Sequence, residues 1–554
     1  MRKIVLLLSF LCFTILSISQ VSQSERAIAL QLVQNNKKAI GINDQDIQNS
    51  VIVHTYIIAN SDVRMVYLQQ SYKDVLVYNS LQVLAFRGQK LVSKAGGRIE
   101  QIQEKVTVAS GFPSLDAITA VRNSLTDVQL VAKEAITPVK VSNNNKKYEF
   151  TRLGVTSEEI SAELLWMPVE GKKDVNLVWQ VFVTPKTTSD YWLVRVDAAT
   201  GIVLNKENLT ITCNWGDGKH NIEEHIAENH GNKGGINSDE NNTTIVGEYV
   251  IQRPENKSWH YKPFVVNSAT YRVVPYPAES PWFPGGSYAL RTDPWNLSPA
   301  GSPATTLKWH DDGTGDYNYT RGNNVWAQED VNGNNGTGAP ATSTTALPDL
   351  TFDFAPDTTM SPTLTSPPNQ QFNITNLFYW NNLMHDIVYQ YGFDEVSGNF
   401  QNDNQGRGGA GSDYVFADAQ DGAGTNNANF ATPADGSNPR MQMFLWNFNG
   451  ANPMKDGDAD NGVIAHEYTH GISNRLTGGP GSSGCLGNAE HMGEGWSDFY
   501  ALMVTHDWST ATPTDGFNNP RPIGLYALNG GGLFGVPGIR HFPYCTNMAV
   551  NPSV

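Results

Sequence analysis

The sequence predicts an α+β protein in which short strands alternate with a few isolated helices. Residues 20–110 and 111–210 each combine one helical stretch with several runs of β-branched and aromatic residues, separated by polar turns. Residues 265–460 are rich in Pro, Gly and Asn, which indicates twisted strands joined by long loops. We therefore expect two small α+β units followed by a larger domain over residues 265–554, with a β-rich first lobe and helices after it.

The two small units make up a leader over residues 20–210. In the first unit we expect a helix over 22–36 and strands over 51–58, 64–70 and 75–85. In the second unit we expect a helix over 114–125 and strands over 178–183, 192–196 and 202–204. The alternative is that the leader is a second folded domain of the mature protein.

One strong helix interrupts the turn-rich part of the large domain. Over residues 376–391, Leu377, Trp380, Met384 and Val388 recur at helical spacing. His385 lies in this helix, and we expect it to be a core histidine with hydrogen-bond partners. A strand is expected over 441–446.

The first residues have the pattern of an export signal. Arg2 and Lys3 precede an apolar run over 4–16 and then small polar residues, which predicts a signal peptide over residues 1–19. No later stretch approaches about 18 consecutive apolar residues. We therefore expect a secreted, extracellular protein that does not act at a membrane.

Charge is distributed unevenly along the chain. From residue 265 onward there are 10 Lys+Arg and 27 Asp+Glu, a net charge of −17, whereas the first 264 residues hold 28 basic and 27 acidic groups. An acidic surface with few lysines argues against nucleic acid or an anionic membrane as a partner.

The segment over residues 211–264 is polar and joins the leader to the large domain. It includes His220, His225 and His230, whose spacing of five does not place them on one helical face. We expect a solvated linker in which maturation cleavage falls, in preference to a metal-binding tract.

Three cysteines remain after the signal peptide. Cys485 and Cys545 lie in the same domain and pair in one interpretation; in the other they stay reduced. Cys213 lies near the linker, and the surrounding residues do not favour a role as a metal ligand.

The most informative motif is His466-Glu467-Tyr468-Thr469-His470. Residues four apart lie on one face of a helix, so His466 and His470 can direct their imidazoles at a common centre. A catalytic zinc takes about three protein ligands and keeps one position for water. Glu467, beside the first histidine, is placed to act as general base toward that water.

The third ligand is expected from the segment that follows. Glu494 is the obvious candidate, because it begins a second helical stretch in which Trp496 and Phe499 contribute to an apolar face. Asp498 lies one turn after Glu494, where it can accept a hydrogen bond from a ligand imidazole. From the residues alone, the motif indicates a metal-dependent hydrolase with one Zn²⁺.

An acidic run precedes the zinc helix. Asp456, Asp458 and Asp460 alternate with small residues, which suggests Ca²⁺ as a second ion. The glycine is displaced from the EF-hand position and no glutamate follows at the right distance. Compensation of charge at the helix N-terminus, with Asp460 or Asn461 as N-cap, is the favoured interpretation.

The segments 463–479 (VIAHEYTHGISNRLTGG) and 492–498 (MGEGWSD) resemble the fungalysin family of secreted zinc metalloendopeptidases, which is related to thermolysin. Residues 376–393 (NLFYWNNLMHDIVYQYGF) and 424–430 (GTNNANF) also resemble it. The resemblance implies that His466, His470 and Glu494 bind zinc and that Glu467 is the catalytic base. It also implies that Asn427 and Ala428, on an edge strand, hold the backbone of the substrate.

The resemblance further implies a zymogen whose leader is a propeptide. The leader would act as an intramolecular inhibitor and chaperone, and the substrates would be proteins or peptides. The family also has an oxyanion-stabilising histidine on a later helix, which we expect beyond residue 554, so that the helical C-terminal lobe is incomplete. The alternative is a non-enzymatic secreted adhesion or matrix protein stabilised by zinc.

Overall fold

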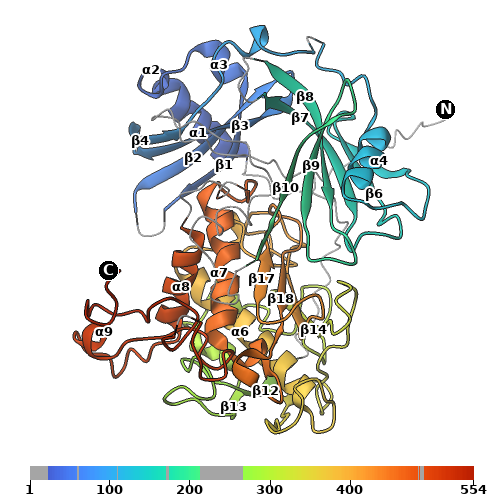
Figure 1. Ribbon diagram of the computed structural model, residues 1–554. Helices are drawn as coiled ribbons and strands as arrows, with labels where there is room; N and C mark the ends of the chain where they lie inside the picture. Colours follow the sequence, from blue (N-terminus) through green and yellow to red (C-terminus); the bar gives the residue numbers. More distant parts are fainter. Residues whose placement is uncertain are drawn as a thin grey trace, which may run out of the picture.

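The computed structural model describes residues 23–58, 61–108, 110–169, 174–212, 266–484, 486, 492–533 and 535–553. Two α+β units formed by residues 23–212, here called the N-terminal units, lie against a C-terminal half formed by residues 266–553 (Figure 1). The mixture of helices and sheets confirms the predicted α+β class. The predicted signal peptide and nearly all of the linker over 211–264 lie outside the described residues.

The first N-terminal unit packs three helices on an antiparallel sheet. The helices are α1 (Gln23–Asn35), α2 (Lys37–Ile40) and α3 (Asp44–Gln48), and the strands are β1 (Ser50–Ile57), β2 (Val63–Tyr72), β3 (Val75–Arg87) and β4 (Lys90–Gly96). The buried Val33, Val66 and Phe86 belong to a core shared by the helices and the sheet. The predicted helix and three predicted strands of this unit are found within two residues of their expected ends.

The second N-terminal unit covers a longer sheet with one helix. The short 3-10 helix η1 (Ile102–Glu104) precedes α4 (Ala117–Asp127), and the strands are β5 (Pro138–Ser142), β6 (Lys147–Phe150), β7 (Ile160–Pro168), β8 (Val175–Val183), β9 (Trp192–Asp197) and β10 (Val203–Asn208). Trp166 and Trp179 are fully buried in its core. A single parallel pairing of Val77 with Trp166 joins the sheets of the two units.

The C-terminal half forms a five-stranded sheet, a three-stranded sheet and a two-stranded ribbon, and residues 210–212 of the N-terminal units add one edge strand to the first of these sheets. Their orders are β11-β17-β18-β16-β14, β13-β12-β15 and β19-β20. The strands are β11 (Thr210–Thr212), β12 (Ser268–Val273), β13 (Ala289–Thr292), β14 (Val325–Glu329), β15 (Asp349–Phe352), β16 (Val415–Ala419), β17 (Ala428–Ala431), β18 (Arg440–Met443), β19 (Leu445–Trp446) and β20 (Lys455–Asp456). The strand predicted over 441–446 is therefore split into β18 and β19.

Three longer helices accompany these sheets; the first two pack on them, and the third packs on the second. They are α6 (Asn369–Gln390), α7 (Asn461–Thr477) and α8 (Gly493–Val504); α9 (Asp515–Asn518) and the 3-10 helices η2 (Pro294–Leu297), η3 (Pro303–Thr305), η4 (Glu395–Ser397), η5 (Phe448–Gly450) and η6 (Gly457–Ala459) are short. Helix α6 begins seven residues before its predicted start, because its first two turns carry polar residues without an apolar pattern.

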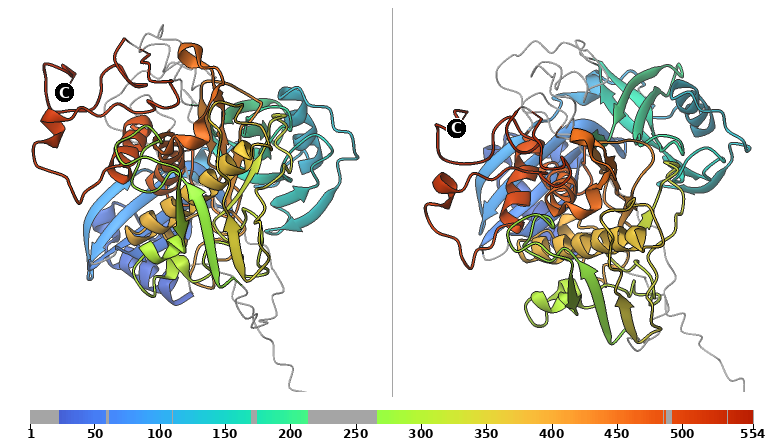
Figure 2. Two further views of the ribbon diagram at one scale, coloured as in Figure 1. Left: turned by 90° about the horizontal axis from the view of Figure 1, so that it is seen from below. Right: turned by 60° about the horizontal axis from the view of Figure 1, so that its bottom comes forward.

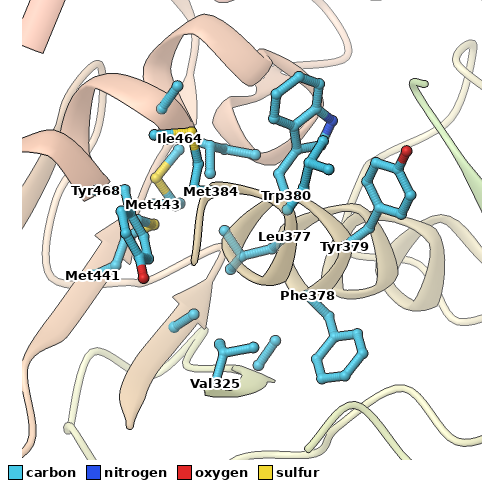
Figure 3. Close-up of a cluster of buried hydrophobic side chains, with 14 of the residues drawn as sticks. Val325, Leu377, Phe378, Tyr379, Trp380, Met384, Met441, Met443, Ile464 and Tyr468 are labelled. Atoms are coloured by element: carbon cyan, nitrogen blue, oxygen red, sulfur yellow. The ribbon is translucent and has the colours of Figure 1, made fainter. Parts of the chain in front are cut away.

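Helix α6 forms the centre of the largest core. Leu377, Trp380 and Met384 of this helix meet Ile464 and Met441 of neighbouring elements (Figure 3). His385 is 1% exposed and contacts Gln401 and Asp386 through its two ring nitrogens, as expected for a core histidine. This packing fixes α7 between α6 and the sheet.

The N-terminal units contact the C-terminal half through a shared strand and a shared apolar cluster. Strand β11, which follows the second unit, pairs antiparallel with β17, with Ile211 opposite Phe430. Leu193 and Leu209 of the N-terminal units are buried together with Ala431 of β17. Figures 1 and 2 show the N-terminal units seated on one side of the C-terminal half.

A buried arginine supports the same interface. Arg440 on β18 is 2% exposed and pairs with Asp418 on β16. Its guanidinium also donates to the Tyr191 hydroxyl at 3.3 Å and lies 3.7 Å from Glu158, both of the N-terminal units.

The described helices include none with the length and apolarity needed to cross a membrane.

Candidate metal centre

Helix α7 carries both histidines of the HExxH motif. Asp460 occupies its N-cap position, as predicted, but its side chain makes no capping hydrogen bond and instead accepts from the backbone of Ala527 at 3.1 Å. The helix continues through Gly471, where a Cβ would lie 2.6 Å from the Phe430 ring. Glycine is therefore required at this position by the close approach of β17 to the helix, and it does not mark a helix end.

Helix α8 lies alongside α7. Trp496 and Phe499, which form part of the predicted apolar face, are 36% and 57% exposed. The face toward α7 instead carries the smaller Ser497, Asp498 and Ala501. Small side chains allow the two helix backbones to approach closely, so apolar spacing alone did not specify which face meets α7.

Three side chains from these two helices converge on one point. The Nε2 atoms of His466 and His470 are 3.0 Å apart. Oε2 of Glu494 lies 3.4 Å from Nε2 of His466, and Oε1 of Glu494 lies 3.4 Å from Nε2 of His470. Both imidazoles are at most 1% exposed, whereas the Glu494 side chain is 24% exposed. Two nitrogen donors and one carboxylate with a partly open side match the donor set of a catalytic zinc site.

Asp498 orients the first histidine. One of its oxygens lies 2.7 Å from Nδ1 of His466, which leaves Nε2 directed toward His470 and Glu494. Asp498 is itself 1% exposed. The predicted role of Asp498 as a partner of a ligand imidazole is supported by this geometry.

Two further residues at the site were not anticipated from the sequence. Arg540 donates to Asp498 at 2.8 Å and to Glu494 at 3.0 Å, and the hydroxyl of Tyr544 donates to Asp498. Both come from a loop more than 40 residues after Glu494, without a helical or strand pattern that would place them here. The sequence offered one indirect signal. Only ten Lys and Arg residues occur from residue 265 onward, so each of them, Arg540 included, is a candidate partner for a buried carboxylate.

The protonation of the donor set reflects this arrangement. Burial opposes the charged imidazolium, but hydrogen bonds from His466 to Asp498 and Glu494 raise its pKa to about 9. Burial lowers the pKa of His470. Burial raises the pKa of Asp498, but this is outweighed by Arg540 and His466, so the net shift is downward. A bound cation would compete with the proton on His466 for the same nitrogen.

The remaining predicted site residues lie nearby. Glu467 is fully buried on α7, one position after His466. Asn427 and Ala428 lie at the start of β17, which packs against α7. They were expected on an edge strand, but β17 has β18 on one side and β11 on the other, and β11 pairs with residues 429–431. Ala428 pairs only with Met443 of β18 among the described residues.

The acidic run before α7 is buried. Asp456 ends β20, Asp458 lies in η6, and burial raises the pKa of both carboxyl groups. Burial, together with the nearby Glu279, raises the pKa of Asp460 to about 8. Calcium binding at this run stays a prediction.

A second cluster of carboxylates lies in the five-stranded sheet and the loops after β14 and β16. Asp330, Asp418 and Asp421 place carboxylate oxygens within 4.8 Å of one another, with Arg440 paired to Asp418 as a counter-charge.

Cys545 forms no disulfide with another described residue. Cys485 and Cys213 lie outside the described residues, so the predicted pairing stays a prediction.

Removing the charge that holds His466 provides a test of this geometry. We expect Asp498→Asn to weaken zinc affinity by roughly 10–100-fold. The carboxylate of Asp498 fixes the tautomer of His466 and raises the basicity of its imidazole, and the neutral amide of asparagine does neither. Zinc affinity is measured by competition with a chromogenic chelator. The exposed Asp507→Asn is the matched control and should leave affinity unchanged; equal affinity in both variants would contradict the role of Asp498.

A buried histidine pair, a carboxylate ligand candidate and an adjacent glutamate lie together on packed helices, which is the donor arrangement typical of a catalytic metal site. Residues 270–554 match the model of the fungalysin metallopeptidase family, M36. The chain therefore belongs to that family.

Individual relatives support the same family. The chain is 42% identical over 304 residues to extracellular metalloproteinase 2 of Trichophyton tonsurans, covering 54% of this chain and 44% of that protein. It is 42% identical over 304 residues, with the same coverage, to extracellular metalloproteinase 2 of Arthroderma otae. It is 43% identical over 292 residues to extracellular metalloproteinase MEP of Fusarium vanettenii, covering 52% and 42%. The chain thus spans less than half the length of these relatives.

Proposed function

We propose that this protein is a secreted zinc metalloendopeptidase that is made as a zymogen and hydrolyses protein or peptide substrates. The observation that carries the proposal is the convergence of His466, His470 and Glu494, with Glu467 beside the first histidine on the same helix. Family membership and the names of extracellular relatives support secretion and peptidase activity. Domain boundaries at 1–19, 20–110, 111–210, 211–264 and 265–554 are part of this proposal.

The residues present fit zinc. His466 and His470 would supply nitrogen ligands and Glu494 an oxygen ligand, and these three ligand atoms already lie within 4.8 Å of one another. When bound, zinc supplies a Lewis acid for the scissile carbonyl and lowers the pKa of the attacking water.

The protein's own groups would move the proton and hold the substrate. Glu467 accepts a proton from the attacking water and then gives it to the leaving nitrogen. Asp498 and Arg540 keep His466 and Glu494 in place during this transfer. Asn427 and Ala428 would bind the substrate backbone at the start of β17.

The alternative, a non-enzymatic protein stabilised by zinc, is less well supported. A structural zinc site is closed by four protein ligands, whereas the described residues place three at this centre, one of them the partly exposed carboxylate of Glu494. Glu467 would have no task at a closed site.

Metal removal tests the proposed activity. Incubating the mature enzyme with a chelator should abolish cleavage of an unfolded protein substrate, and added Zn²⁺ should restore it, because the metal activates the water. Cleavage is followed by release of fluorescent peptides. Chelator-resistant hydrolysis would contradict a zinc mechanism.

We infer that the N-terminal units are the propeptide and restrain the enzyme. Strand β11 occupies the side of β17 that the resemblance assigns to substrate, and it runs antiparallel toward Ala428. The separate cores of the N-terminal units allow them to remain docked after cleavage of the linker.

Disrupting the shared strand tests this restraint. Ile211→Pro removes a backbone donor from β11 and should raise the initial rate of peptide cleavage by the precursor, since proline cannot complete the ladder. Ile202→Pro, at an exposed turn before β10, is the control. An unchanged initial rate in Ile211→Pro would contradict inhibition through β11.

A further inference from the structure

A histidine of the N-terminal units lies at the end of the candidate zinc helix. His54 on β1, with Tyr56 and Tyr67, faces the stretch from Arg475 to Pro480 that ends α7 and leads away from it. We call these residues, together with Ser397, the His54 contact. The approach is close, because a Cβ on Gly479 would lie 3.2 Å from the Tyr67 ring, and the φ of +86° at this position also favours glycine.

His54 is held in this contact as a neutral aromatic group. It is 8% exposed, and its Nε2 atom has no hydrogen-bond partner within the described parts of the chain. Its ring lies 5.3 Å from that of Tyr56 and 5.5 Å from that of Tyr67. Burial lowers the pKa of His54 from 6.5 to about 4.

The charged side chain of the C-terminal half that lines the His54 contact is Arg475, and its charge is already paired. Arg475 is fully buried, and its guanidinium pairs with Asp413 at 3.1 Å and with Asp435 at 3.5 Å. Those two carboxylates are therefore already committed to Arg475. Among the described residues, no carboxylate lines the His54 contact itself; its other titratable groups are the phenols of Tyr56 and Tyr67.

We propose that acid weakens docking of the N-terminal units on the C-terminal half, because protonation of His54 places a positive charge in a buried contact that no described carboxylate lines. The inference rests on the proposed function, in which these units restrain the enzyme. It adds a condition for their release: an acidic medium promotes undocking, while a neutral medium preserves the restrained precursor.

The direction and size of the effect follow from proton linkage. Undocked, His54 titrates near its ordinary value of 6.5; docked, its pKa is about 4. The undocked state therefore binds more protons between these values, so docking is strongest above pH 6.5 and weakens as the pH falls toward 4. Between pH 7.5 and pH 5 this shift favours undocking by about 25-fold.

Hydrogen exchange of the full chain measures docking without any need for hydrolysis. The zinc-loaded precursor carries Glu467→Gln, which prevents self-cleavage. Peptides covering β1, β2 and residues 475–480 are followed at pH 7.5 and pH 5, with correction for the intrinsic pH dependence of exchange. We expect their opening equilibrium to rise by about 25-fold.

Two variants assign the response to His54. His54→Phe keeps an aromatic ring without a titratable nitrogen and should hold the change below about twofold, whereas His506→Phe, in the C-terminal half, should retain the full response. A response in His54→Phe equal to that of the parent would overturn the inference, as would a parent that shows no response.

A direct titration covers the case in which His54→Phe does not fold. The pKa of His54 is read from the ring-carbon resonances of histidine-labelled precursor. A value near 4 is expected; a value near 6.5 would overturn the inference. Neither measurement depends on catalysis, so their failure would leave the proposed zinc peptidase activity intact, and loss of that activity would be seen separately with the chelator.

Discussion

Glu467→Gln is expected to lower kcat for peptide hydrolysis by about 10²–10⁴-fold while zinc stays bound. Glutamine has nearly the same shape as glutamate but cannot accept the proton of the attacking water. The ligand atoms of His466, His470 and Glu494 are unaffected, so zinc content should match that of the parent.

Turnover and zinc content, measured together, distinguish loss of the general base from loss of the metal. Turnover is measured with a fluorescent peptide on the mature enzyme, and zinc is measured by elemental analysis of the same sample. Glu329→Gln, on β14, is a matched control for the chemical change and should retain near-normal turnover. Near-normal turnover of Glu467→Gln with full zinc would refute Glu467 as the general base.

Arg475→Met is expected to destabilise the C-terminal half by about 3–5 kcal/mol, because it leaves two buried carboxylates without their cation. Arg475 is fully buried near the end of α7 and donates to the backbone oxygens of Pro433 and Gly398 at 2.7 and 3.0 Å. Asp413 and Asp435 are its ionic partners. The loss should appear as a lower denaturant midpoint for the C-terminal half.

The pH dependence of this loss distinguishes charge from packing. Burial already raises the pKa of Asp413 and Asp435, so without Arg475 both carboxyl groups should be neutral over a wider range. Destabilisation should therefore be largest at pH 8 and smaller at pH 5. The exposed Arg291→Met should change stability by no more than about 0.5 kcal/mol; a loss of similar size in both variants would contradict the burial argument.

The local sequence pattern was sufficient to predict the position of side chains that lie on a single helix. The spacing of His466 and His470 on a single helix predicted that their imidazoles would meet, and they are 3.0 Å apart. The next ligand candidate, Glu494, was also found because it opens the following long helix. The core helix α6 was predicted from the recurrence of Leu377, Trp380 and Met384.

Features that depend on packing between distant segments were not accessible in the same way. Arg540 and Tyr544 reach Asp498 from an irregular loop, whose path no periodicity specifies. The apolar pattern of α8 did not specify which face meets α7, because small residues, here Ser497 and Ala501, can face a neighbouring helix as effectively as large apolar ones. The pairing of β11 with β17 joins residues about 220 positions apart.

Zinc analysis of the intact, full chain tests the central claim most directly. The account predicts one zinc per chain, bound through two imidazole nitrogens and a carboxylate oxygen in X-ray absorption, and loss of that zinc in His470→Ala. A metal-free intact protein, or zinc retained in full after both His470→Ala and Glu494→Ala, would contradict it.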